Sequence, residues 1–168
     1  MAIVYLSLGS NKGDRIGYIQ QATGLLGLSE KISIIRTSAF YETEPWNMTT
    51  KTWFVIAVVE IKTSYTPEEL LAECQRIEKQ LGRTPKETAG YADRTIDIDI
   101  LFYGKEIINE NNLVIPHKYL HLRAFNLVPL LELIPDFEHP VIHKTISELH
   151  NDLENPEMVF LYGTRVDI

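Results

Sequence analysis

Two aspartates separated by a single residue, Asp97 and Asp99, are the strongest chemical signal in the sequence. Around them polar residues alternate with isoleucines, which is typical of a β-strand with one face buried. Side chains two residues apart on a strand point to the same face, so both carboxylates share a face while the isoleucines turn to the core. Like charges placed in this way repel each other. Bound Mg²⁺ would compensate them, since Mg²⁺ uses one or two carboxylates together with substrate phosphates; salt bridges to arginine or lysine are the alternative.

Basic side chains accumulate in the residues just before this pair. Residues 75–94 contain five cations and three acids, and the cations are Arg76, Lys79, Arg83, Lys86 and Arg94. Such cations bind phosphate oxygens through charge-assisted hydrogen bonds, while carboxylates bind the accompanying metal. The pattern predicts a site for a metal-bound polyphosphate, and a loop that is basic only for solubility is the alternative.

Three further polar residues are candidates for the same site. Gln75 and Glu78 are three residues apart on an expected helix and can therefore face one pocket, although an exposed pair on a surface helix would have the same spacing. His117 could donate to a phosphate or act as an acid, or it could be structural. Other histidines have no helical metal-binding spacing and are interpreted as surface residues: His139, His143 and His150.

The strands that must position these residues follow from apolar patterning. The expected strands are 2–9, 32–41, 53–63 and 95–102, with shorter apolar pieces at 107–108 and 113–115. The third is too apolar for an exposed edge. A turn over residues 9–13 follows the first strand; no phosphate-binding P-loop or dinucleotide-binding glycine motif is present in the sequence.

Helices are indicated by capping residues and by an apolar repeat of three and four residues. Asp14 could cap a helix over about 15–26. The clearest helix begins with Thr66, Pro67 and Glu69, the pattern of a capping box with proline at the first helical position, and Gly82 ends it. Its apolar stripe includes Cys74, which is therefore expected in the core. Later helices are expected near 126–134 and 146–153.

The order strand, helix, strand, strand, helix, strand over residues 2–103 predicts an α+β, ferredoxin-like sandwich, a mainly antiparallel sheet with helices packed on one face. A chain of 168 residues with 45% hydrophobic residues fits one domain, 1–168, with a core over 1–135. An acidic extension over 136–168 completes the chain. Residues 132–168 hold eight acids and two bases, so they supply most of the net charge of −7, and the predicted site makes no use of them.

Composition also bounds the compartment and the partners. An acidic chain without a basic face is not expected to bind nucleic acid. No apolar run approaches the ~18 residues of a membrane span, and the first residues do not resemble a signal peptide. A single cysteine fits a reducing compartment. We expect a cytoplasmic protein with no membrane partner, working as a monomer.

Several sequence blocks, in order from residue 3 to about 135, resemble the 6-hydroxymethyl-7,8-dihydropterin pyrophosphokinases. The blocks are Leu8-Gly9-Ser10-Asn11, Phe40-Tyr41-Glu42-Thr43-Glu44-Pro45, Gln75-Arg76-Ile77-Glu78, Gly82-Arg83, Arg94-Thr95-Ile96-Asp97-Ile98-Asp99-Ile100-Leu101, Val114-Ile115-Pro116-His117 and Arg123-Ala124-Phe125. The resemblance implies a ferredoxin-like enzyme of folate biosynthesis that transfers pyrophosphate from ATP to the hydroxymethyl group of the dihydropterin and releases AMP. It implies two Mg²⁺ ions as cofactors and ATP as co-substrate.

The resemblance also implies a role for each matching residue. Asp97 and Asp99 would bind the two Mg²⁺ ions, and Arg83 and Arg94 would hold phosphates and stabilise charge as AMP leaves. The remaining ATP contacts would come from Gln75, Glu78, Ile100 near the adenine, and His117 at the phosphates. Lys118 stands where the family often has tyrosine and could itself contact phosphate.

Pterin binding by the family pattern involves aromatic rings and polar edges. Phe54 and Phe125 would sandwich the flat ring, with Thr43 and Trp46 at its polar edge. Arg123 would lie beside the pocket, and Tyr91 could close over the substrate as an aromatic lid.

Some positions depart from the family. Ile56 replaces an asparagine that hydrogen-bonds the pterin, Pro85 replaces a second arginine, and Tyr91-Ala92-Asp93 replaces Trp-Gly-Pro. The loss at position 56 leaves open a non-catalytic, nucleotide-binding paralog with altered pterin specificity. A ferredoxin-like RNA-binding domain is a third hypothesis, which the charge supports little.

Overall fold

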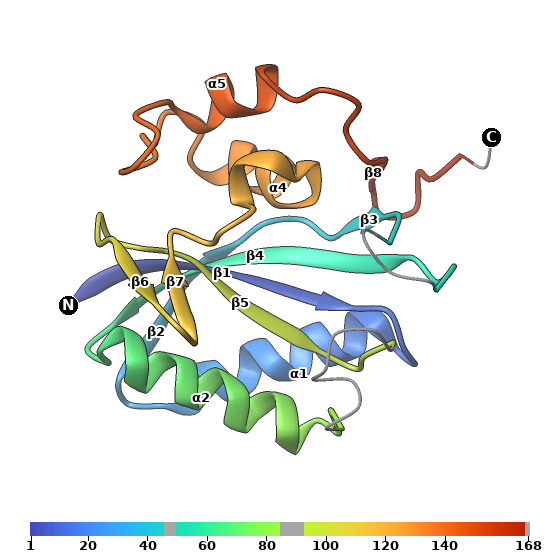
Figure 1. Cartoon of the computed structure of the whole chain (residues 1–168). Coiled ribbons are helices and arrows are strands. Elements are labelled where there is room, and N and C mark those ends of the chain that lie inside the picture. Colours follow the sequence, from blue (N-terminus) through green and yellow to red (C-terminus); the bar gives the residue numbers. More distant parts are fainter. Residues whose placement is uncertain (46–49, 85–92, 167–168) are drawn as a thin grey trace.

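The computed structural model describes residues 1–45, 50–84 and 93–166. Its central element is a six-stranded, mainly antiparallel sheet in the order β5-β1-β4-β3-β8, with β2 also paired to β4 (Figure 1). The strands of this sheet are β1 (Ala2–Ser10), β2 (Ile32–Thr37), β3 (Tyr41–Thr43), β4 (Phe54–Thr63), β5 (Asp97–Tyr103) and β8 (Val159–Leu161). The two longest, β1 and β4, pair along their whole lengths, from Ala2 opposite Thr63 to Ser10 opposite Val55.

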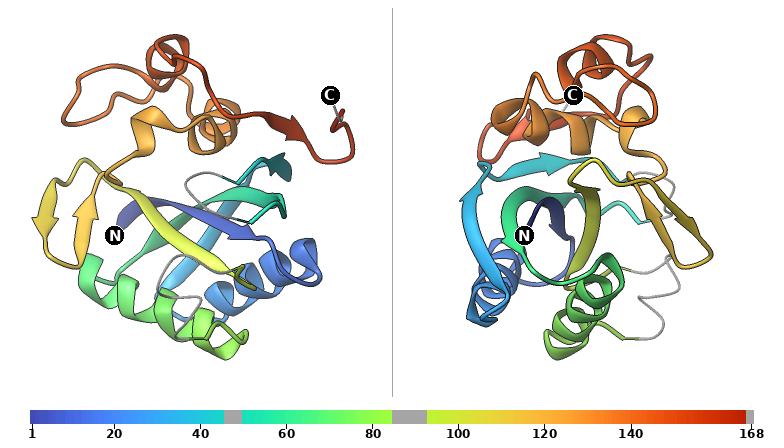
Figure 2. Two further views of the ribbon diagram at one scale, coloured as in Figure 1. Left: turned by 45° about the vertical axis from the view of Figure 1, so that its right-hand side comes forward. Right: turned by 90° about the vertical axis from the view of Figure 1, so that its left-hand side faces the viewer.

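Helices cover both faces of this sheet, as Figure 2 shows from two further sides. The helices α1 (Arg15–Leu28) and α2 (Pro67–Gln80) lie on one face, and α4 (Ala124–Leu133) and α5 (Ile146–Asn151) lie on the other. The expected ferredoxin-like order is present in β1-α1-β2-β3-β4-α2-β5. As expected for residues 2–103, α1 and α2 lie on one face. Beyond these residues, the second face of the sheet is also apolar and packs against α4 and α5.

Each face of the sheet has its own apolar core. Val4, Leu6 and Leu8 of β1 alternate toward α1 and α2, where they meet the apolar stripe of α2 that includes Cys74. Tyr5, between them in sequence, points to the opposite face and packs with the apolar residues of α4 and α5. The period of two along a strand therefore produces a three-layer molecule from one sheet.

Local capping explains where the first two helices begin and end. Asp14 accepts a hydrogen bond from the Gly17 amide at 3.0 Å and caps α1. Thr66 and Glu69 form the expected capping box of α2. At the other end of α2, Gly82 adopts a positive φ of 93°, which a residue without a Cβ reaches at little cost.

Two expectations about the fold were wrong. The segment expected as one strand over 32–41 is divided into β2 and β3, because the Ser38 hydroxyl accepts the Val58 amide at 2.9 Å and replaces a backbone partner. His139 is only 4% exposed instead of lying on the surface. Its ring packs against Phe102 of β5, and its Nδ1 accepts two backbone N–H groups.

The remaining short elements join the sheet to the α4 layer. A two-stranded ribbon of β6 (Ile108–Glu110) and β7 (Leu113–Ile115) precedes the 3₁₀ turn η1 (Leu120–Leu122). Within the described residues, no helix is both long and apolar enough to cross a membrane.

Candidate active site

The two aspartates of the sequence motif lie at the start of β5, an edge strand of the sheet. Asp97 lies opposite Gly9, and Asp99 lies opposite Ser7, on the neighbouring strand β1. Ile98 and Ile100 are 5% exposed and belong to the core beside α1 and α2. The predicted alternation is confirmed, because both aspartates are only partly buried and share the face that the isoleucines leave.

Arg83 reaches this edge from the end of α2. The turn at Gly82 lets the Arg83 amide donate to the Glu78 carbonyl at 3.0 Å, which directs the chain back toward β5. The Arg83 Nη1 then lies 2.6 Å from Glu78 Oε2 and 2.9 Å from Asp97 Oδ1. Glu78 also accepts the Ile98 amide at 2.8 Å, so this carboxylate joins helix α2 to the outer edge of β5.

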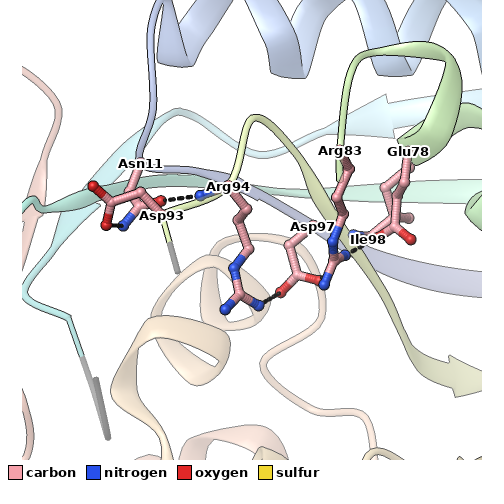
Figure 3. A network of polar contacts seen from close by, with 7 residues as sticks. All are labelled: Asn11, Glu78, Arg83, Asp93, Arg94, Asp97 and Ile98. Carbon is pink, nitrogen blue, oxygen red and sulfur yellow. Dashed lines mark hydrogen bonds and ion pairs between the residues drawn. The ribbon is translucent and has the colours of Figure 1, made fainter. Parts of the chain in front are cut away.

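Arg94 approaches Asp97 from the opposite side. Figure 3 shows its guanidinium directed at Asp97, and Nη1 lies 3.7 Å from Asp97 Oδ2. Arg94 is 8% exposed. Two arginines that are 11 positions apart in the sequence thus converge on one carboxylate.

Asn11 holds the backbone of Arg94, a role that the sequence analysis did not assign. It is 1% exposed. Its Oδ1 accepts the Arg94 amide at 2.8 Å, its own amide donates to the Arg94 carbonyl at 3.2 Å, and its Nδ2 donates to Asp93 Oδ1 at 3.0 Å (Figure 3). The one available signal was its place in the Leu8-Gly9-Ser10-Asn11 block.

The electrostatics of the cluster favour an additional cation. Burial raises the pKa of Asp99 well above its ordinary value, and the charges of Asp97 and Glu78 raise it further. Burial also raises the pKa of Glu78 to about 7, although the Ile98 amide and Arg83 oppose this. Three carboxylates thus face two arginines, so positive charge placed here would favour the ionised acids.

These residues suit a metal ion whose coordination shell is completed by ligands from outside the protein. Across the described ranges, no group of three or more histidine, cysteine, aspartate or glutamate side chains is arranged to hold a metal ion. Asp97 and Asp99 offer hard carboxylate oxygens on one face, and Mg²⁺ takes few protein ligands when phosphates complete its shell. The donor set therefore fits Mg²⁺ bound together with a polyphosphate.

A cavity of about 650 Å³ opens between α2 and β5 beside this cluster. Gln75 and Glu78 both line it, so the structure brings together the two helical residues that were expected to share a pocket. Its remaining lining comes from the same two elements and the turn between them: Leu71, Lys79, Arg83, Asp97, Ile98 and Asp99. The side chain of Ile100 lies in the core instead and does not line this cavity.

His117 and Lys118 differ in how closely the structure relates them to the cluster. The His117 amide donates to the Leu101 carbonyl of β5 at 3.0 Å. Burial lowers the pKa of the His117 imidazole, and the nearby Asp97 charge opposes that shift, which relates His117 to the same carboxylate as the two arginines. Lys118 is exposed, and its ammonium lies 5.2 Å from the centre of the Tyr119 ring.

The candidate pterin residues come from three elements. Thr43 of β3 is 2% exposed and lies opposite Phe54 of β4. Gly9 of β1 separates Asp97 of β5 from Ile56 of β4 in register, and a Cβ placed on Gly9 would lie 3.3 Å from Ile56 Cδ1 and 3.5 Å from Phe54 Cδ1. The glycine therefore lets the side chains of Ile56 and Phe54 pack closely against β1 beside the aspartates.

The other candidate pterin residues lie at the start of α4 or outside the described residues. Arg123 and Phe125 are at the start of α4, the helix that covers this face of the sheet. Ile56, which replaces the family asparagine, is 6% exposed. Trp46 and Tyr91 fall outside the described residues.

Comparisons with known proteins agree with these observations. A family model for 7,8-dihydro-6-hydroxymethylpterin-pyrophosphokinase (HPPK) matches residues 5–135. A 2-amino-4-hydroxy-6-hydroxymethyldihydropteridine pyrophosphokinase of Aquifex aeolicus is 43% identical over 148 residues, which cover 88% of this chain and 90% of the relative. The enzyme of the same name from Methylorubrum extorquens is 42% identical over 136 residues, covering 81% of this chain and 85% of the relative.

Among solved structures, a chain described as HPPK-DHPS in complex with substrates superposes with a TM-score of 0.72 at 16% identity. The alignment covers 89% of this chain and 43% of that longer chain, and at this identity it supports the fold alone. The match over residues 5–135 and the two relatives above 40% identity show that the chain belongs to the 7,8-dihydro-6-hydroxymethylpterin-pyrophosphokinase family.

Proposed function

We propose that this chain transfers pyrophosphate from ATP to the hydroxymethyl group of 6-hydroxymethyl-7,8-dihydropterin, as its family does in folate synthesis, and that the Asp97 cluster binds the phosphates. The observation that carries the site assignment is the convergence of Arg83 and Arg94 on Asp97, beside Asp99. Opposed cations and carboxylates at one cavity suit a phosphate chain that arrives with its metal.

In the reaction, the hydroxymethyl oxygen forms a bond to the β-phosphorus of ATP. The bond from that phosphorus to the oxygen shared with the α-phosphate breaks, AMP leaves with that oxygen, and the hydroxyl proton is released. Because no covalent protein intermediate is required, the contribution of the chain is to orient the two substrates and to stabilise charge.

Asp97 and Asp99 would hold two Mg²⁺ ions. Bound there, the ions would supply positive charge to the phosphate oxygens and neutralise the charge that develops in the reaction. The two oxygens of Asp97 contact Arg83 and Arg94, one each. If Asp97 held a metal, Arg83 and Arg94 would be available to bind the phosphate oxygens.

The remaining contacts divide between the two substrates. Gln75 and Glu78, on the cavity wall, would orient ATP, with His117 and Lys118 toward the phosphates. The expected contact of Ile100 with the base finds no support in the structure, because its side chain lies in the core. Phe54 and Phe125 would stack on the pterin, with Thr43 at its polar edge. Arg123 would lie beside the ring, and Trp46 and Tyr91 would complete the pocket.

The wider setting belongs to the same proposal. We infer a cytoplasmic monomer that binds small molecules and neither nucleic acid nor membrane, and a single domain over 1–168. The acidic charge over 136–168 argues against a polyanionic partner there. The small-molecule substrates need no macromolecular partner for the chemistry.

Product analysis tests the function directly. With ATP, Mg²⁺ and the hydroxymethyl dihydropterin, the chain should release AMP in a one-to-one ratio to pyrophosphorylated pterin, followed by phosphorus NMR or chromatography. ADP as the nucleotide product would exclude pyrophosphate transfer. Calorimetric binding of a non-hydrolysable ATP analogue with Mg²⁺, without any binding of the pterin, would instead support a non-catalytic paralog.

A variant tests the metal assignment separately. Asp97→Asn keeps the shape of the side chain but removes a charge, so we expect Mg²⁺-dependent turnover to fall by at least about 100-fold, the loss of one strong electrostatic contact. Asp152→Asn is the matched control, because Asp152 is half exposed and pairs with Lys144 instead. AMP release by Asp97→Asn at close to the wild-type rate would overturn the metal assignment.

A further inference from the structure

The C-terminal segment, residues 157–165, lies against the walls of the proposed pterin pocket. It includes β8, which adds to the edge of β3 with Val159 opposite Thr43. These residues lie beyond the 5–135 match to the family. Sequence patterning offered no sign that they approach the site.

Glu157 caps helix α4, although it is more than 30 positions away in the sequence. The N-cap residue Arg123 provides no side-chain cap, and the first turn of α4 contains no acid. Glu157 Oε1 instead accepts the Ala124 amide at 3.1 Å, and Oε2 accepts the Phe125 amide at 3.3 Å. A carboxylate at a helix N-terminus satisfies free N–H groups and interacts favourably with the helix dipole. Glu157 therefore holds the backbone of Phe125 itself.

The next residue connects the same segment to the opposite wall. The Met158 amide donates to Glu44 Oε1 at 2.7 Å, and the Glu44 amide donates to the Met158 carbonyl at 3.2 Å. Glu44 directly follows Thr43 at the end of β3. Residues 157 and 158 thus join the two elements that carry Phe125 and Thr43.

The rest of the segment packs on the residue next to Phe54. The Phe160 ring stacks on Trp53, with centroids 6.1 Å apart and planes at 28°. The Arg165 guanidinium lies 4.5 Å from the Trp53 ring centre and 3.4 Å from Glu42 Oε2. Glu42 also pairs with Arg15 at 3.0 Å, and Arg15 donates to the Trp53 carbonyl at 3.0 Å. The backbone before Phe54 is therefore held from two sides.

We infer that Glu157 is a positioning residue for the pterin, which sets the place of Phe125 relative to Phe54 and Thr43. The inference rests on the proposed pterin pocket. A flat ring stacks well only when its aromatic partners stand at the correct separation and tilt. Loss of the Glu157 carboxylate would free the first turn of α4 and widen this separation, while the Asp97 cluster keeps its own contacts with Arg83 and Arg94.

The kinetic test compares Glu157→Ala and Glu157→Gln with Glu154→Gln. Glu154 is exposed and three residues away, which makes it a matched control. We expect Glu157→Ala to raise the KM for the pterin about 10-fold, or about 1.4 kcal/mol, with the KM for ATP within about twofold of wild type. Glu157→Gln should restore part of the affinity, because its amide oxygen still accepts one N–H group.

Two further measurements decide between positioning and simple stability. Calorimetry gives the pterin Kd in the presence of Mg²⁺ and a non-hydrolysable ATP analogue, and urea unfolding shows whether each variant is folded under assay conditions. Equal increases in both KM values, or an unchanged pterin Kd in a folded Glu157→Ala, would overturn the inference. If the wild type binds pterin but releases no AMP, the proposed reaction is wrong, and the pterin Kd of the variants still tests the positioning role of Glu157. If the wild type binds no pterin, both the proposed reaction and the positioning role are wrong.

Discussion

Replacing Asn11 by alanine tests whether the position of Arg94 depends on a side chain far from it in the sequence. Asn11 precedes Arg94 by 83 positions, yet its side chain accepts the Arg94 amide and donates to Asp93. Both Asn11 and Arg94 are almost completely buried. Alanine would remove these hydrogen bonds and leave the Arg94 N–H without its side-chain partner.

The magnitude follows from the two contacts that are lost. An unsatisfied buried donor costs about 1–3 kcal/mol, and a hydrogen bond to a charged group contributes about 1.5–3 kcal/mol when buried. Asp93 is only partly buried, so water replaces part of the second contact. We therefore expect the free energy of unfolding of Asn11→Ala to be about 2–4 kcal/mol lower than that of the wild type.

Turnover should fall through the same displacement. The Arg94 guanidinium lies 3.7 Å from Asp97, and a shift of about 1 Å in a positioning group can cost about 100-fold in rate. We expect kcat for AMP release to fall by about 10- to 100-fold. Urea unfolding and a coupled AMP assay measure the two effects on the same preparation. Asn112→Ala is the control, because Asn112 is exposed in the turn between β6 and β7.

Either of two results would refute this reasoning. An unfolding free energy within about 0.5 kcal/mol of wild type would mean that water replaces the contacts of Asn11, as it does at ordinary surface sites. A clear loss of stability with kcat unchanged would mean that the backbone anchor of Arg94 does not determine where its guanidinium lies.

Two further predictions concern buried titratable groups. Burial, together with the charges of His121 and His143, lowers the pKa of His139 from 6.5 to about 4. As the pH falls, the unfolded chain therefore protonates this histidine before the folded chain does. The free energy of unfolding should fall below about pH 6.5, by about 2 kcal/mol between about pH 7 and pH 5. Urea unfolding should show this loss in wild type and not in His139→Asn, and equal pH dependence in both would contradict it. Burial raises the pKa of the Cys74 thiol, and Cys74 is 1% exposed. A thiol reagent should therefore label the native chain no faster than local or global unfolding exposes the thiol. Rapid labelling of the folded protein would show that this part of the core is accessible.

Much of the scaffold was predictable because its determinants are local. The capping box at Thr66 and Glu69 involves residues three apart, and the turn at Gly82 depends on one residue without a Cβ. The placement of Asp97 and Asp99 on one face needed only the period of a strand. Such signals survive in a single sequence because both partners lie within one turn or one strand repeat.

Failures of prediction occurred where distant segments compete for the same backbone groups. Ser38 lies between β2 and β3 because its hydroxyl accepts a hydrogen bond from the Val58 amide of β4. No local sequence pattern indicates this contact. His139 was interpreted as a surface residue because it has no helical metal-binding spacing, but it packs against Phe102 on the second apolar face of the sheet. In both cases the sheet register and the second helical layer determine the outcome.

The sequence by itself therefore determined the chemistry available to this protein. The paired aspartates, the arginines before them and the family blocks indicated a metal-assisted transfer from a nucleoside triphosphate. Only the tertiary structure decided which groups meet: Arg83 and Arg94 at Asp97, Asn11 at Arg94, and Glu157 at the start of α4. The physical reason is that a strand or a cap is defined over a few residues, whereas an ion pair or a buried hydrogen bond between distant residues exists only once packing has set their distance.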